Sequence, residues 1–183
     1  MIVFDGDSTI AAGVHGVPED KTWPYMLSKS IPALYVNMAK SESTAARCYL
    51  RLWKAIQHNP KWYVLQVGQW SCTQEPIDAF EHYVRLIIEE MNQRECEVLL
   101  ITPPFTLKRE RFSADPYRRK LLELAKIYRV NYLDLYGYIR DSGHSLDVAE
   151  LFTPDGALCH FNESGHRFVY ELFAQKTLEN LCK

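Results

Sequence analysis

The stretch Phe4-Asp5-Gly6-Asp7-Ser8-Thr9 continues directly from the apolar run Met1–Phe4 at the start of the chain. Residues 2–4 predict a short buried strand, and Gly6 predicts a tight turn at its end. Open α/β sheets bind their ligands at the carboxyl ends of the strands. The polar side chains of this turn are therefore the first candidates for chemistry.

Two chemistries fit this turn. In the first, Ser8 is an activated hydroxyl, which needs a base, an orienting acid and donors for an oxyanion. In the second, Asp5 attacks a phosphate and Asp7 donates a proton, with Mg²⁺ offsetting the charge. This pattern resembles the first motif of haloacid-dehalogenase-type phosphatases, which also need an acidic pair after a later strand. Thr102-Pro103-Pro104 follows the strand predicted at 97–101 without such a pair, so we favour the hydroxyl.

Length and composition are those of an ordinary globular chain. The 183 residues predict one domain, 1–183, with a sizeable core. A formal net charge of −2 gives no argument for a nucleic-acid or anionic-membrane partner. No apolar run approaches the roughly 20 residues of a membrane span. Met1 enters the first strand directly, which predicts that no signal peptide is present.

The five cysteines are scattered along the chain and form no C-x-x-C pair. Their odd number favours reduced thiols and a cytoplasmic location over a disulfide framework. Hydroxyl chemistry predicts neither a metal nor a cofactor, and the sequence does not indicate an oligomeric state.

Short apolar segments alternate with amphipathic ones along the whole chain. This alternation predicts a five-stranded parallel sheet covered by helices on both faces. Polar residues gather after the first three strands and before the last helix, which places them along one edge of the sheet. The predicted strands after the first are 33–37, 62–67, 97–101 and 130–135, and the predicted helices are 23–30, 41–58, 76–94, 115–128 and 163–181, with a possible helical turn at 146–151.

The tail carries the second group of chemical residues, Asp155…His160-Phe161-Asn162-Glu163-Ser164-Gly165-His166. Together with Asp7-Ser8 near the start, this segment resembles the SGNH (GDSL) hydrolase family over essentially the whole chain. The order and spacing of the blocks carry the resemblance, since any single block is a weak signal. The blocks are Gly6-Asp7-Ser8, Asn37–Thr44, Val67–Ser71 and Asp155…His160, with family-like strand ends at Thr102-Pro103-Pro104 and Leu133–Tyr136.

The resemblance implies a flavodoxin-like three-layer α/β/α sandwich and the hydrolysis of an ester or acyl group. It makes Ser8 the nucleophile, His160 the general base and Asp155 the acid that orients and charge-stabilises the imidazole. The family's oxyanion hole comprises the Ser8 N–H, a glycine N–H in the second block and an asparagine side chain in the third. Each such donor contributes roughly 3–4 kcal/mol in acyl transfer.

The chain departs from the family pattern at three positions. Glu42 stands at the second-block glycine, which keeps a backbone N–H if Glu42 adopts the turn geometry. Trp70 replaces the third-block asparagine, and an indole N–H differs from an amide in reach and direction. Gln69, Ser71 or Thr73 could substitute for it, and the sequence does not rank them. Asp155 lies five residues before His160 rather than three, so either the extra residues bulge or Ser8 and His160 act as a dyad.

Four further residues are predicted to form the substrate-binding surroundings: Asp7, Asn37, Gly68 and Gln69. Asp7 is expected to hold its turn through backbone hydrogen bonds, and Asn37 either closes a strand or positions the second-block turn. The predicted function is hydrolysis of a small acyl ester, with O-acetylated carbohydrate as one substrate class. The alternatives are an acyltransferase, a weakened binding protein of the same fold and, less favoured, the phosphatase using Asp5 and Asp7.

Overall fold

The computed structural model describes residues 1–11, 16–104, 113–141, 148–153 and 160–176. Its centre is a five-stranded sheet in the order β2-β1-β3-β4-β5, and all four strand pairings are parallel. Parallel pairing brings the carboxyl ends of all strands to one edge. The strands are β1 (Ile2–Gly6), β2 (Tyr35–Asn37), β3 (Trp62–Gln66), β4 (Glu97–Ile101) and β5 (Asn131–Leu133).

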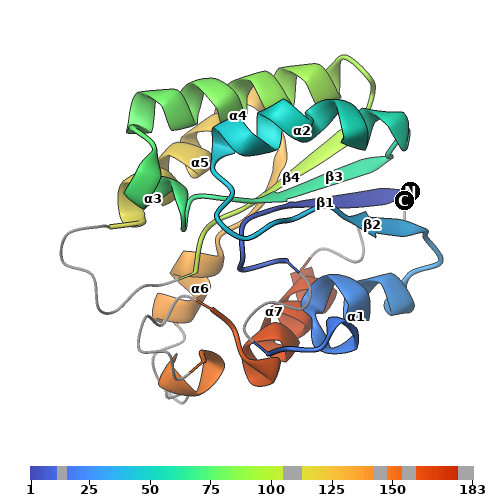
Figure 1. The fold of residues 1–183 in the computed structure, drawn as a ribbon, viewed down its shortest axis with the longest axis vertical. Coiled ribbons are helices and arrows are strands. Elements are labelled where there is room, and N and C mark those ends of the chain that lie inside the picture. The colour runs from blue at the N-terminus through green and yellow to red at the C-terminus, as the bar shows by residue number, and fades with distance from the viewer. Residues whose placement is uncertain (12–15, 105–112, 142–147, 154–159, 177–183) are drawn as a thin grey trace.

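Helices cover both faces of the sheet, as Figure 1 shows. One layer comprises α2 (Ala45–Gln57), α4 (Ile77–Asn92) and α5 (Asp115–Tyr128), and the other contains α1 (Trp23–Ser30) and α7 (Glu163–Lys176). This is the three-layer α/β/α architecture that the sequence predicts. The shorter elements are η1 (Glu19–Lys21), α3 (Ser71–Gln74), α6 (Leu135–Asp141) and η2 (Val148–Leu151).

The strands are apolar on both faces because each face packs against helices. Alternate residues of β1 therefore enter different cores. Phe4 points toward α1 and α7, where its ring meets Trp23 edge-on at 5.3 Å, and Trp23 stacks on Phe173 at 5.0 Å. Val3 belongs to the opposite core, beneath α2 and α4. This double packing fixes the strand whose end carries Ser8.

Four of the five predicted strands have different boundaries in the structure: β2 begins at Tyr35 rather than at residue 33, β3 ends at Gln66 rather than at residue 67, and β1 and β5 differ more clearly. β1 does not end at Phe4 but continues through Gly6, which pairs with Gln66 of β3. Gly6 has φ +150°, and a Cβ there would lie 1.9 Å from the Gln66 carbonyl oxygen, so only glycine fits. The strand predicted at 130–135 is limited to residues 131–133, because Asp134 accepts the Gly137 N–H and begins α6.

The remaining differences concern helices: α2 begins at Ala45 rather than at residue 41, and α4 spans Ile77–Asn92 rather than 76–94. The sequence pattern did not predict α3 or α6, because each has fewer than two full turns of apolar periodicity. The helical turn predicted at 146–151 is a 3₁₀ helix at Val148–Leu151. The last predicted helix is described as far as Lys176, and residues 177–181 lie outside the described part. None of the helices described has the length and apolar character to cross a bilayer.

Candidate active site

Ser8 and His160 meet at the carboxyl edge of the sheet although they are 152 residues apart in the chain. The His160 Nε2 atom lies 3.0 Å from the Ser8 Oγ atom, within hydrogen-bond distance. Both residues are half-buried, so the pair is reachable from solvent yet held by the protein. When Nε2 is the unprotonated ring nitrogen, it accepts the Ser8 hydroxyl proton, which is the geometry of a base beside a nucleophile.

The segment that carries His160 is fixed by Asn162. Its Nδ2 group donates to the carbonyls of Glu150 at 2.7 Å and Phe152 at 3.1 Å, and its Oδ1 atom accepts the Gly165 N–H at 2.9 Å. The backbone of His160 also takes part, because its carbonyl accepts the Thr153 N–H at 2.9 Å. The backbone that carries the His160 side chain is therefore anchored before α7 begins.

Asp7 is buried and makes internal contacts on both carboxylate oxygens. Its Oδ1 atom accepts the Thr9 hydroxyl at 2.7 Å and the Thr9 backbone N–H at 3.1 Å. Its Oδ2 atom accepts the backbone N–H of Trp70 at 3.3 Å. Burial raises the pKa of Asp7, and these hydrogen bonds partly oppose the rise. Asp7 thus holds the turn in which Ser8 lies and joins it to the turn after β3.

Asp5 lies on the opposite face of the sheet from Phe4, against α2. Its carboxylate accepts hydrogen bonds from Arg51, from the Tyr63 hydroxyl at 2.8 Å and from the Gly6 N–H at 2.7 Å. Burial raises its pKa, with these partners lowering it in part. A carboxylate enclosed in this way is not available to attack a phosphate, so the phosphatase alternative gains no support here.

Glu42 adopts the left-handed conformation expected of the glycine that it replaces. Its φ is +61°, and its side chain is exposed, which leaves the carboxylate in contact with solvent. Among the described residues, neither the Ser8 N–H nor the Glu42 N–H makes a hydrogen bond. Both N–H groups are therefore left for a ligand.

The turn after β3 contributes polar side chains of unequal availability. The Ser71 hydroxyl accepts the Ala45 N–H at 3.3 Å, and the Thr73 hydroxyl donates to the Trp70 carbonyl at 2.8 Å. Neither the Trp70 indole N–H nor the Gln69 side-chain amide N–H makes a hydrogen bond with the part of the chain described here, and the Gln69 Oε1 atom is buried without a partner there. Trp70 and Gln69 are therefore better placed than Ser71 or Thr73 to replace the missing asparagine.

Two other predicted residues shape the surrounding turns. Asn37 donates from Nδ2 to the Ile10 carbonyl at 2.9 Å and accepts the Ala39 N–H at 3.1 Å, which ties the Ser8 loop to the end of β2. Gly68 has φ +123°, and a Cβ there would lie 3.3 Å from Pro103. Asp155 lies outside the described residues, so the proposed acid has no described position.

Sequence reasoning missed two arginines that organise this edge. Arg51 contacts the end of β1, and Arg118 donates to both carboxylate oxygens of Asp134, at 2.8 and 2.6 Å. Partial burial opposes ionisation of Asp134, but the hydrogen bonds from Arg118 and Gly137 lower its pKa overall. The signal for Arg51 was its i,i+4 spacing from Arg47, directly after the second-block turn. The Arg118 contact joins distant segments and has no local signal.

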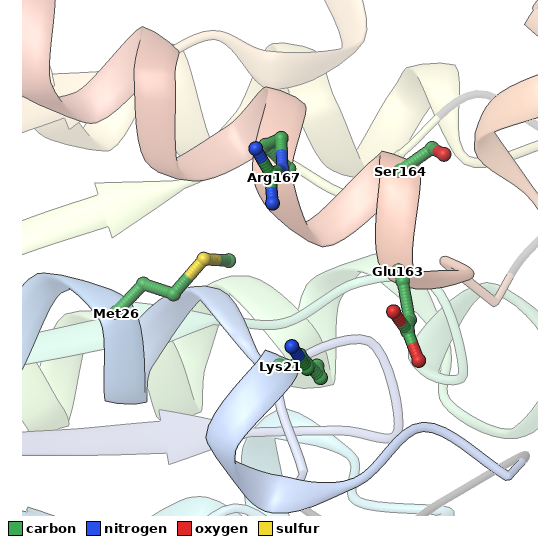
Figure 2. A pocket seen from close by; sticks show the side chains of 5 residues that line it. All are labelled: Lys21, Met26, Glu163, Ser164 and Arg167. Atoms are coloured by element: carbon green, nitrogen blue, oxygen red, sulfur yellow. The ribbon is translucent and has the colours of Figure 1, made fainter.

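A pocket of about 180 Å³ opens beside the start of α7. Figure 2 shows Lys21 and Met26 on the η1–α1 side, facing Glu163, Ser164 and Arg167 from the first turns of α7. Neither Ser8 nor His160 lines it, although Glu163 lies only three residues after His160. The pocket is thus adjacent in sequence to the candidate site but separate from the reacting pair.

Comparisons with known proteins give one family and one fold. The model of the GDSL-like Lipase/Acylhydrolase family matches residues 4–168. The structure resembles a lipase/acylhydrolase from Enterococcus faecalis, with TM-score 0.80, 19% identity and coverage of 96% of this chain and 93% of the other. It also resembles the acetylxylan esterase Axe2 from Geobacillus stearothermophilus, with TM-score 0.79, 17% identity and coverage of 95% and 92%.

A third solved structure is the psychrotrophic esterase EstA from Pseudoalteromonas sp., inhibited by monoethylphosphonate. It gives a TM-score of 0.78 at 14% identity and covers 100% of this chain and 98% of its own. Identities this low show the shared fold alone. A search among curated protein sequences finds no match.

Proposed function

The chain belongs to the GDSL-like lipase/acylhydrolase family, and we propose that it cleaves a small acyl ester through an acyl-enzyme on Ser8. Family membership confirms the resemblance drawn from the sequence and makes the protein a serine hydrolase of the esterase/acylhydrolase class. The observation that carries the proposed mechanism is the 3.0 Å approach of His160 Nε2 to Ser8 Oγ.

In the proposed reaction, His160 takes the hydroxyl proton as Ser8 Oγ attacks the ester carbonyl carbon. The carbonyl π electrons move onto oxygen, and the resulting oxyanion is held by the Ser8 and Glu42 N–H groups. Collapse of this intermediate breaks the bond to the alcohol, which leaves with the proton from His160. A water molecule, deprotonated by His160, then attacks the acyl carbon. As the bond from this carbon to Ser8 Oγ breaks, the imidazolium returns its proton to Oγ, which releases the carboxylic acid and restores Ser8 and neutral His160.

Trp70 completes the oxyanion hole in this proposal through its indole N–H, with Gln69 as the neighbouring substitute. The availability of both side chains supports this role, whereas the hydroxyls of Ser71 and Thr73 are engaged. Asp155 would orient His160 and stabilise the imidazolium. Without that contact, Ser8 and His160 would act as a dyad.

The proposed substrate is a small-molecule ester, with O-acetylated carbohydrate as the first class to test. The likeness to an acetylxylan esterase supports this choice. The half-buried position of the Ser8–His160 pair suits a small acyl group. The mechanism uses protein groups and water. Cytoplasmic location remains part of the proposal, supported by the buried thiols of Cys48 and Cys96, which are not in disulfides.

Two other outcomes are kept as alternatives. An acyltransferase would pass the acyl group from Ser8 to an alcohol other than water. A binding protein would retain the fold but no longer hydrolyse an ester at an appreciable rate. The replacement of asparagine by Trp70 is the observation that favours it. The two differ in whether Ser8 reacts at all.

Labelling with a fluorophosphonate probe separates these possibilities. The purified protein and its Ser8→Ala and His160→Ala variants are treated with the probe, and adducts are located by mass spectrometry. The esterase proposal expects one adduct on Ser8, much slower labelling in His160→Ala and hydrolysis of p-nitrophenyl acetate. No adduct would support the binding protein. Mg²⁺-dependent cleavage of p-nitrophenyl phosphate without acetate cleavage would instead support the phosphatase.

A further inference from the structure

We propose that Arg51 is a positioning residue that holds the Glu42 turn against the end of the strand that carries Ser8. The inference rests on the proposed function, because it concerns the two backbone N–H groups assigned to the oxyanion. Arg51 touches neither reacting atom. It acts by fixing the distance and angle between the segments that supply these donors.

The Arg51 guanidinium bridges two segments that are far apart in sequence. Its Nε atom donates to Asp5 Oδ1 at 2.9 Å, and its Nη2 atom donates to the Gly6 carbonyl at 3.0 Å. Its Nη1 atom donates to the Ser43 hydroxyl at 2.8 Å. Gly6 lies two residues before Ser8, and Ser43 directly follows Glu42. One planar group thus contacts both donor-bearing segments.

The anchor of this bridge is rigid because Asp5 is itself fully enclosed. The Asp5 side chain is 0% exposed, that of Arg51 is 12% exposed, and Tyr63 and the Gly6 N–H complete the carboxylate's hydrogen bonds. A buried ion pair is rarely more stabilising than well-packed apolar side chains of the same volume. Directional contacts to both segments therefore explain the pair better than stability does.

The turn itself needs support because Glu42 is not glycine. A left-handed conformation costs a non-glycine residue on the order of 1 kcal/mol. Arg47, one helical turn before Arg51 on α2, donates to the Glu42 carbonyl at 2.8 Å. The Lys40 N–H donates to the Gly6 carbonyl at 3.1 Å, beside the Arg51 contact. The two arginines and this backbone contact hold the turn in place.

The test compares Arg51→Lys and Ser43→Ala with the wild type and with Arg94→Lys as a control. Arg51→Lys keeps the charge beside Asp5 but loses the planar fork. Ser43→Ala leaves the Asp5–Arg51 pair intact and removes both the Arg51 contact and the hydrogen bond that the Ser43 hydroxyl donates to the Lys40 carbonyl at 2.8 Å, so Arg51→Lys is the variant that isolates the guanidinium. Arg94, in the turn after α4, pairs with Glu90 of α4 at 2.8 Å, and both side chains are partly exposed, so its variant controls for loss of a guanidinium elsewhere.

We expect kcat on p-nitrophenyl acetate to fall roughly 10- to 100-fold in Arg51→Lys and Ser43→Ala while KM changes less than threefold, since small misplacements of catalytic groups have effects of this size. Inhibition by methylboronic acid, which forms a tetrahedral adduct on Ser8, should weaken in parallel with kcat/KM. Arg94→Lys should retain both values.

Wild-type kcat in folded Arg51→Lys and Ser43→Ala, with unchanged boronate inhibition, would overturn the positioning role. A lower melting temperature with unchanged kcat would overturn it as well, because that pattern is purely structural. Absence of both hydrolysis and a Ser8 adduct in the wild type would instead overturn the proposed function, so the two failures are distinguishable.

Discussion

The Asp7 carboxylate accepts the Trp70 backbone N–H at 3.3 Å, which joins the turn after β1 to the turn after β3. The residue next to Ser8 and the residue at the family's asparagine position are therefore mechanically linked. Asp7 also accepts the hydroxyl and the backbone N–H of Thr9, so one carboxylate contacts both turns. The site behaves as one unit whose parts come from several strand ends.

The first prediction concerns the proposed nucleophile. Ser8→Ala should lower the rate of p-nitrophenyl acetate hydrolysis by at least about 10³-fold, because no other group forms the acyl-enzyme. Its melting temperature should stay within about 2 °C of the wild type, since the hydroxyl's contact within the described part of the chain is with His160. Activity that survives in Ser8→Ala would contradict the assignment.

The second prediction separates the two available side-chain donors after β3. Trp70→Phe removes the indole N–H but keeps an aromatic ring, and it should lower kcat roughly 100-fold, the effect of losing one oxyanion donor. Gln69→Met is the matched change at the neighbouring residue and should reduce kcat less than threefold. Steady-state kinetics on one ester decide the matter, and the reverse ranking would assign the donor to Gln69.

The third prediction tests the backbone geometry that precedes Ser8. Gly6→Ala should lower the free energy of unfolding by about 2–4 kcal/mol, because the new Cβ would overlap the Gln66 carbonyl. Gly16→Ala is the control: Gly16 has φ +79° with open space around the added Cβ, so only conformational strain of about 1 kcal/mol is expected. Urea unfolding of both variants measures the difference, and equal losses would argue against the close approach.

The fourth prediction concerns the pH dependence of stability. Burial lowers the pKa of His166 from 6.5 to about 4, and its Nδ1 atom accepts the backbone N–H of Trp23 at 3.4 Å. The unfolded chain therefore binds this proton more readily than the folded one. The stability associated with neutral His166 is complete above about pH 6.5 and is lost as the pH falls toward 4, up to roughly 3 kcal/mol in total.

His166→Gln should flatten this part of the stability profile, measured by urea unfolding between pH 4 and 7. Glutamine cannot titrate but retains an oxygen that can accept the Trp23 N–H. His58→Gln, at an exposed position, serves as the matched control and should keep the wild-type slope. A slope unaltered in His166→Gln would show that other groups set the acid sensitivity.

The sequence was sufficient to predict the architecture and to identify Ser8 and His160 as a candidate pair. Each of these two residues lies in a short block with a characteristic local pattern. The sequence was not sufficient for the roles of Asp5 and Arg51. Asp5 looked like a second carboxylate of the same turn, yet the alternation of a strand sends it to the opposite face from Phe4. Local sequence gives no measure of which distant group then encloses it.

Prediction from sequence was limited at the turn after β3 for a similar reason. Gln69, Ser71 and Thr73 were equally good candidates from the sequence. Only the structure distinguishes them, because the Ser71 hydroxyl contacts the Ala45 N–H and the Thr73 hydroxyl contacts the Trp70 carbonyl. The short helix α6 was missed because one side chain, Asp134, ends β5 and begins the helix by accepting the Gly137 N–H. Such capping depends on a single contact, which periodicity does not register.

The antiparallel bridge between Phe152 and Phe161, with their rings stacked at 5.2 Å, attaches the imidazole-bearing segment to the body of the protein late in the chain. During ribosomal synthesis Ser8 is made before its partner, which follows 152 positions later. A nascent or prematurely terminated chain that lacks this bridge would carry the hydroxyl without a base. Under the proposed mechanism, a nascent chain would therefore gain hydrolytic competence only after the segment that carries His160 has been synthesised.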